Sequence, residues 1–212
     1  MKIIPAMGLI ALACAPPLCA QRPQAHSPIG FTYSLPDDWQ LVTPDPAPPR
    51  PRLPENMPEE VRKGLACVDM PLAAGHGNPR SAVVVVTLPF DCYGETMSEG
   101  DLEVWGSAWL EGLKTRFDFT GPIETTYELA GHTLWIERVK ATPKAKTAPS
   151  FTLETACTLL KKGAVCWMVQ AADAEGLAAF EQSPVSLEGA VAQRLVPAGV
   201  FQKIATPLAP PK

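Results

Sequence analysis

The sequence is poor in charged residues and has no excess of positive charge. Charged side chains make up 19% of the 212 residues, below the quarter or so that is usual for globular proteins, and the formal net charge is -4. These values exclude a highly charged disordered chain and a coiled coil. Because nucleic-acid binding needs a basic surface, we expect no nucleic-acid partner.

The motifs of common catalytic and metal sites are also absent. The sequence contains no Gly-x-Ser-x-Gly, His-Glu-x-x-His, Cys-x-x-Cys, phosphate loop or dinucleotide fingerprint. The three histidines, at positions 26, 76 and 132, fall in segments expected to be exposed. We therefore expect no cofactor, no metal and no catalytic residue. A hydrolase is the alternative if the fold brings His76 or His132 into one cleft with a carboxylate and a hydroxyl.

Long apolar runs are missing except at the N-terminus. Lys2 precedes the apolar run Ile3–Ala15, and small residues follow as far as Ala20. This pattern is typical of a secretory signal peptide, and the run is shorter than the ~20 residues that cross a membrane. We predict a signal peptide over residues 1–20, cleaved after Ala20 or, alternatively, after Ala15.

A bacterial lipoprotein is a further alternative. Cys14 follows an Ala-Leu-Ala sequence, so cleavage before Cys14 would leave an N-terminal cysteine for lipid attachment. Two acyl chains make such an anchor stable, whereas one does not. In either case we predict an exported protein, periplasmic or extracellular, with no transmembrane span in the mature chain.

Proline is abundant and divides the chain. Residues 21–28 are polar and include two prolines, which predicts a disordered lead-in. Seven of the fifteen residues in 44–58 are proline, so this stretch forms neither helix nor central strand and is predicted to be an extended surface loop. We predict a single domain over 29–195 and a flexible tail over 196–212.

Apolar runs and short turns predict an antiparallel sheet. Phe31–Leu35 alternates in polarity, and Val83–Val86 is apolar throughout, as in a strand at the centre of a sheet. Strand-like runs at 123–129 and 133–139, and at 151–160 and 164–171, are joined pairwise by short turns. Strands joined in this way pair antiparallel.

One amphipathic helix is clearly marked. Ser98 stands three residues before Asp101, which is a capping arrangement. The apolar residues that follow have the spacing of one helix face, and they are Leu102, Trp105, Trp109, Leu113 and Phe117. We expect the two indoles to be buried against the sheet, and a second helix at 173–181. The fold class is then α+β, an antiparallel sheet of about six to eight strands with two main helices packed on it.

The first strand is similar to that of a known superfamily. Phe31-Thr32-Tyr33-Ser34-Leu35-Pro36-Asp37-Asp38-Trp39 resembles the aromatic-strand-Leu-Pro-x-x-Trp opening of the PsbP-like α/β/α sandwich proteins. Those proteins usually carry Gly where this chain has Asp38. The later order of Trp-bearing helix, two hairpins and short helix with Phe180 is also similar. The resemblance, over about residues 29–190, implies a binding scaffold without known catalytic residues.

Four cysteines follow the predicted signal peptide, an even number that suits disulfides in an oxidising compartment. We predict a disulfide between Cys67 and Cys92. We expect none between Cys157 and Cys166, because a three-residue turn at Lys161–Gly163 would place them on opposite faces of the sheet. A two-residue turn would place them opposite each other, but it would need positive φ at two lysines.

These features predict an exported, non-catalytic binding or scaffold protein of the bacterial cell envelope. We expect a monomer whose partner is an unknown protein or other envelope component; a lipoprotein of a membrane assembly, held by Cys14, is an alternative. The proline-rich loop and a basic segment that suits an acidic partner are the predicted contact surfaces. Their candidate residues are Pro48, Pro49 and Pro51 in the loop, and Lys140, Lys144 and Lys146 in the basic segment.

Overall fold

The computed structural model describes residues 24–42, 59–77, 81–145 and 148–201, and the statements below concern those residues. Its larger sheet has seven antiparallel strands, in the order β3 (Gln40–Leu41), β4 (Asp69–His76), β5 (Ser81–Pro89), β9 (Gly163–Ala171), β8 (Phe151–Leu160), β7 (His132–Pro143) and β6 (Phe117–Leu129). The smaller sheet has four, in the order β1 (Gln24–Ser27), β2 (Phe31–Ser34), β10 (Pro184–Leu187) and β11 (Gln193–Arg194). The predicted α+β class with an antiparallel sheet is confirmed.

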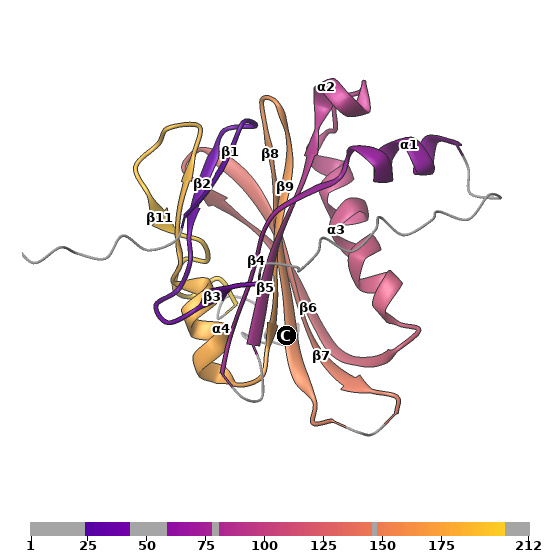
Figure 1. Cartoon of the computed structure of the whole chain (residues 1–212), viewed down its shortest axis with the longest axis vertical. Coiled ribbons are helices and arrows are strands. Elements are labelled where there is room, and N and C mark those ends of the chain that lie inside the picture. Colours follow the sequence, from indigo (N-terminus) through magenta and orange to yellow (C-terminus); the bar gives the residue numbers. More distant parts are fainter. Residues whose placement is uncertain (1–23, 43–58, 78–80, 146–147, 202–212) are drawn as a thin grey trace, which may run out of the picture.

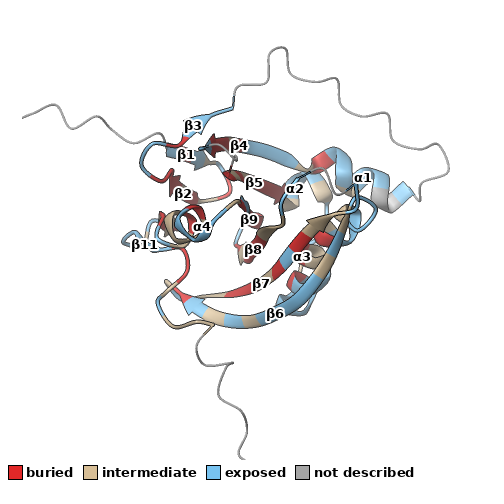
Figure 2. Ribbon diagram, turned by 90° about the horizontal axis from the view of Figure 1, so that it is seen from below, coloured by how far each residue is buried: buried red, intermediate tan, exposed pale blue. Residues whose placement is uncertain are grey.

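The larger sheet lies between two layers (Figure 1). Helices α1 (Glu59–Cys67), α2 (Phe90–Tyr93) and α3 (Glu99–Leu113) lie on one side, and the smaller sheet and α4 (Ala174–Glu181) lie on the other. Buried residues gather on the strands between the layers, whereas β6 and α1 are largely exposed (Figure 2). None of the helices within the described ranges is long and apolar enough to cross a membrane.

The principal elements lie where the sequence predicts them. The N–H of Ser98 donates to Asp101 Oδ2 at 2.7 Å, which completes the expected cap of α3. Strand β5 lies inside the sheet between β4 and β9, and Val83 and Val85 are fully buried. Asp38 adopts a φ of 66°. This is the left-handed region that glycine favours and that Asp tolerates better than most residues.

Both predicted boundaries of the domain need correction. Gln24–Ser27, expected in a disordered lead-in, forms β1 and pairs with β2. At the other end, Val196 is buried, and the Phe201 ring lies 3.8 Å from the Arg138 guanidinium carbon. The first residues of the predicted tail are thus packed on the domain, because they carry apolar side chains that the core accepts. Residues 202–212 lie outside the described part of the chain.

Strand β6 is longer than the prediction, which began at Ile123. It starts at Phe117, a residue expected on the helix, and it passes through Gly121 and Pro122. Gly121 has a φ of 61°, and the pairing with β7 shifts between Thr120 and Ile123, as in a bulge. Pro122 is tolerated because β6 is an edge strand of the sheet.

The expectation that Cys157 and Cys166 do not bond is wrong. Leu160 pairs directly with Gly163, so the turn has two residues, and the two cysteines face each other with Cα atoms 4.1 Å apart and form a disulfide. Gly163 belongs to the strand, where it pairs with Leu160 and Pro89, and the position needs glycine because a side chain would meet the Leu88 carbonyl oxygen at 2.7 Å. Neither turn lysine has positive φ. The cost assumed for the two-residue turn therefore does not arise.

Candidate functional site

Helix α3 contacts the sheet through a narrower face than its apolar pattern predicts. Its buried residues are Leu102, Gly106 and Leu110, one from each successive turn. A side chain at Gly106 would collide with the indole of Trp135 on β7, so the glycine lets the helix come close to the sheet. Trp105 and Trp109 lie beside this face and are only partly buried. The expected burial of both indoles against the sheet is therefore met only in part: Trp105 packs on the core cluster of Leu102 and Trp135, but neither indole is fully covered.

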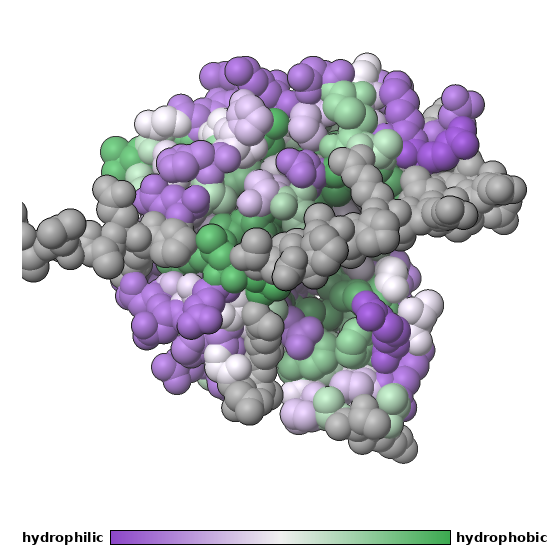
Figure 3. Space-filling view, viewed as in Figure 1, coloured by the Kyte–Doolittle hydropathy of each residue, from purple (hydrophilic) through white to green (hydrophobic). Residues whose placement is uncertain are grey.

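The two indoles line a cleft of about 740 Å³ between α3 and α1, a volume in the range of ligand sites. In the space-filling view, apolar residues reach the surface at several places among hydrophilic ones (Figure 3). The lining of the cleft comes from α1 and the residue after it, the end of β5, the end of α2 and the segment after it, and one side of α3. These residues are Gly64, Leu65, Val68, Leu88, Tyr93, Glu95, Thr96, Met97, Asp101, Val104, Trp105, Ala108, Trp109 and Gly112.

The polar groups of the cleft are few. Glu95 and Asp101 are the charged residues of its lining, and the described lining contains no histidine. Asp101 takes hydrogen bonds from the backbone N–H and the hydroxyl of Ser98, which lower the pKa of its carboxyl and keep it ionised. The indole nitrogen of Trp109 is buried without a hydrogen-bond partner among the described residues. That edge of the indole is therefore covered by the protein, and the part of the side chain that reaches the cleft is apolar.

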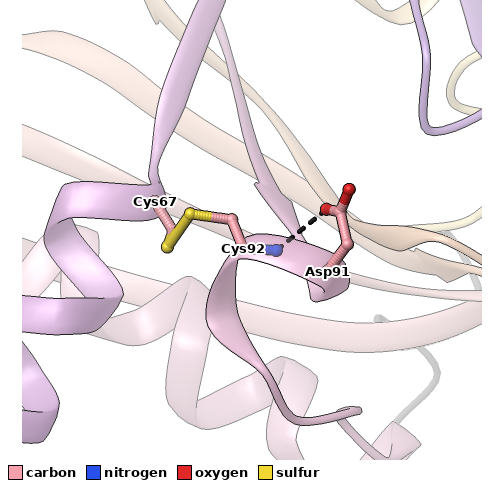
Figure 4. The surroundings of a disulfide bond; sticks show 3 residues. All are labelled: Cys67, Asp91 and Cys92. Atoms are coloured by element: carbon pink, nitrogen blue, oxygen red, sulfur yellow. Dashed lines mark hydrogen bonds between the residues drawn. A yellow bond between two sulfur atoms is a disulfide. The ribbon is translucent and has the colours of Figure 1, made fainter.

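A disulfide fixes one wall of the cleft. Cys67 ends α1 and Cys92 lies on α2, and the predicted disulfide between them is present, with Cα atoms 5.6 Å apart (Figure 4). The Asp91 carboxylate accepts the N–H of Cys92 at 2.9 Å, which holds the short helix in place. The covalent bond therefore ties α1 to the segment that begins at the end of β5.

A second hollow, of about 420 Å³, lies beside α4 and the β4–β5 hairpin and brings His76, Ser81 and Asp173 into one lining. These are the residue types expected of a hydrolase, but each is engaged elsewhere. The ring of His76 stacks on Trp39, and its Nδ1 lies 3.2 Å from the carbonyl oxygen of Asp38. No hydrogen bond among the described residues joins the histidine to Ser81 or Asp173.

The other two members of that group support the backbone around α4. The buried Ser81 hydroxyl accepts the N–H of Ala172 at 3.0 Å. Asp173 caps α4 by accepting the N–H of Gly176 at 2.8 Å. His132, the other candidate base, lies with Nδ1 3.0 Å from the Leu159 carbonyl oxygen, at a turn end. The histidines therefore hold loops and strands together in the described structure.

The predicted basic surface is only partly available for contact. Lys140 is exposed on β7. The Lys144 ammonium donates to the Lys114 carbonyl oxygen at 2.5 Å and lies 3.9 Å from the Asp118 carboxylate, so it binds within the chain. Lys146, the prolines 48, 49 and 51, and Cys14 lie outside the described residues.

A buried ionic cluster lies on the α4 side of the larger sheet. Arg138 on β7 faces Glu154 on β8 and donates to its carboxylate at 2.6 Å, and it also bonds to Glu181 of α4. Burial raises the pKa of Glu154 to about 7, against the opposing effect of Arg138, and burial also raises the pKa of Glu181. Glu154 is only 1% exposed, while Arg138 and Glu181 are about a quarter exposed, so the ion pairs join β7, β8 and α4 at the border of the core.

No group of three or more metal-binding side chains is close enough together to hold a metal ion in the described ranges. No protein-family model matches the chain, and no curated protein matches it.

The cleft residues were missed in the sequence because the two indoles were assigned to the core. Gly106 was the signal in the sequence, because a glycine on one face of a helix indicates that the helix comes close to its neighbour there. The buried face of α3 is then the one that contains Gly106, and the two tryptophans lie beside it.

Proposed function

We propose that this protein is an exported, non-catalytic binding protein of the bacterial cell envelope and that the α1–α3 cleft is its contact site. The partly exposed indoles of Trp105 and Trp109, which line a largely apolar cleft, carry the proposal. Aromatic side chains with apolar surface and a few polar groups are typical of binding sites. A partner that removes this apolar surface from water gains hydrophobic free energy.

Two disulfides support the exported location. Disulfides persist in oxidising compartments and are rare in the cytosol, and this chain forms both Cys67–Cys92 and Cys157–Cys166. We also propose the PsbP-like sandwich as the finer fold assignment. The left-handed φ of Asp38, where those proteins usually carry glycine, and the layers on both sides of the larger sheet support it.

Site-specific crosslinking in living cells tests the function. A photoreactive amino acid replaces Val104, which is 71% exposed in the cleft, and in a control it replaces Val191, which is 84% exposed in the loop before β11. We expect a defined adduct with an envelope component at Val104 and none at Val191. Equal adducts at both positions, or none at Val104 in correctly exported protein, would contradict the proposed site.

A hydrolase is the second candidate, because the hollow beside α4 gathers His76, Ser81 and Asp173. Turnover of small esters and peptides by the purified protein tests it, with His76→Ala as the comparison. We expect no turnover above that of the His76→Ala variant, since the Ser81 hydroxyl is buried and supports the backbone. Turnover that His76→Ala abolishes would make the protein an enzyme.

A further inference from the structure

We infer that the α1–α3 cleft binds a basic, amphipathic peptide segment of a partner protein. The inference rests on the proposed function and names the chemistry of the partner. The first argument is shape. The side of α3 that lines the cleft extends from Asp101 to Gly112, which at ~1.5 Å per residue is a length of about 16 Å. An elongated site beside a helix is typical of grooves that take a peptide through its apolar side chains.

The second argument is the apolar surface that the cleft leaves in water. Val104 is 71% exposed and Leu65 is 40% exposed, and both lie in the lining. Added to the indoles of Trp105 and Trp109, they form two apolar walls that face a common space. Apolar side chains spaced along one face of a peptide would bury these walls together, which a single compact polar ligand would not do.

The third argument is charge. Among the described residues of the lining, the charged ones are Glu95 and Asp101, both acidic, and α3 contains no lysine or arginine. Arg62 and Lys63 of α1 are exposed, but neither belongs to the lining. Lysine or arginine side chains at the edge of a bound peptide would meet these carboxylates and the faces of the indoles, which attract cations. The same carboxylates would repel an acidic peptide, although the Lys63 ammonium lies beside Gly94, next to Glu95.

Three twelve-residue peptides test the inference by calorimetry and by the fluorescence of the indoles. One is built of Leu and Lys with its Leu residues on one helical face, one has the same composition in scrambled order, and one has Glu in place of Lys. We expect the first to bind at least tenfold more tightly than either control. Equal binding of the scrambled peptide, or binding of the acidic peptide, would overturn the inference.

Two charge reversals of equal size locate the contact. Glu95→Lys changes the lining of the cleft, whereas Glu103→Lys changes an exposed residue of α3 outside the lining. We expect Glu95→Lys to weaken binding of the Leu/Lys peptide at least fivefold and Glu103→Lys to change it less than twofold. Equal effects would show attraction by net charge alone and would overturn the assigned contact. Circular dichroism of both variants checks that the fold is kept.

The failure of this inference differs from the failure of the proposed function. A neutral apolar fluorescent dye, titrated into the full exported chain, reports the cleft whatever the charge of its natural partner. Dye binding that Trp109→Ala weakens, with no binding of any peptide, would overturn the peptide inference and leave the proposed binding site standing. Absence of both dye binding and Val104 adducts would contradict the proposed function, because the cleft would then bind nothing.

Discussion

The two faces of the larger sheet are built from the same strands but are covered to different extents. On the α4 side, Trp167 is fully buried and packs against Phe31, with ring centroids 5.5 Å apart. On the α3 side, Trp105 and Trp109 remain partly exposed beside a cleft. The first face meets a second sheet together with a helix, whereas the second face meets helices alone.

The difference follows from the width of the covering elements. Seven strands at ~4.8 Å spacing make a sheet about 29 Å wide, and a helix with its side chains covers only ~10 Å of that width. The smaller sheet and α4 together cover their face. On the other face α3 and α1 lie apart, and the cleft is the space that they leave. Incomplete cover therefore creates the one apolar surface that we assign to binding.

The largest expected difference between the faces concerns their tryptophans. Trp167→Ala removes a fully buried indole and is expected to lower the free energy of unfolding by about 3 to 5 kcal/mol. Trp109→Ala removes a partly exposed indole and is expected to lower the free energy of unfolding by about 1 kcal/mol, because less buried apolar surface is lost. Urea denaturation of both variants checks the contrast. Equal costs would show that the indoles of the α3 side are core residues after all.

The two disulfides offer a second contrast. Cys67–Cys92 closes a loop with a sequence separation of 25, and Cys157–Cys166 closes one with a separation of 9. From loop entropy, replacing the first pair by serine is expected to lower the free energy of unfolding by about 3.5 kcal/mol, and replacing the second pair by about 2.6 kcal/mol. Cys92 is exposed, whereas Cys157 and Cys166 are fully buried. A mild thiol reductant is therefore expected to open the first bond while the fold protects the second.

Alkylation followed by mass spectrometry measures which thiols are released. Hydrogen exchange should rise in α1 once Cys67 is reduced, and peptide binding in the cleft should weaken with it. Simultaneous release of all four thiols under native conditions would contradict the assigned burial of the second bond.

The α4 side differs from the α3 side in holding the buried carboxyl of Glu154. Burial raises its pKa to about 7, so between about pH 4.5 and 7 the folded protein binds a proton that the unfolded chain does not. Stability should therefore fall as the pH rises through this range, by up to about 3 kcal/mol at ~1.4 kcal/mol per pH unit. The raised pKa values of Glu137 and Glu181 add to the same slope.

Glu154→Gln should flatten this pH dependence without removing it, because Glu137 and Glu181 still titrate. Thermal unfolding from pH 4 to pH 8 checks the slope for both proteins. A stability that rises over this range in the native protein would mean that Arg138 holds Glu154 ionised throughout.

Local signals in the sequence were enough to predict α3, its cap and two hairpins within residues 123–171, but not the start of β6 at Phe117 or the register of the second hairpin. They were not enough for β1, because Gln24–Ser27 pairs with β2, which itself pairs with β10 about 150 residues later, so the strand depends on contacts distant in the sequence. The ionic cluster had a partial signal in Glu154, a single charge within an apolar strand. Its partner Glu181 comes from a helix whose placement depends on the whole fold.

Two glycines of α3, Gly106 and Gly112, have opposite surroundings, and both help to shape the cleft. A side chain at Gly106 would collide with Trp135, while an added Cβ at Gly112 meets nothing within 4 Å. Gly106→Ala is therefore expected to cost about 1 to 3 kcal/mol through overpacking. Gly112→Leu is expected to raise the free energy of unfolding by about 0.5 to 1 kcal/mol, because glycine is unfavourable within a helix.

Gly112→Leu also sharpens the contrast between the covered and the open face, because its side chain enters the cleft and fills part of the space that a ligand needs. The variant should thus unfold at higher urea concentration than the native protein and yet bind the Leu/Lys peptide and the neutral dye more weakly. Stability and binding would then move in opposite directions after one substitution. If binding were unchanged in the stabilised variant, the ligand would not occupy the part of the cleft at the end of α3, and the assigned length of the site would have to be shortened to the region around Val104 and Trp105.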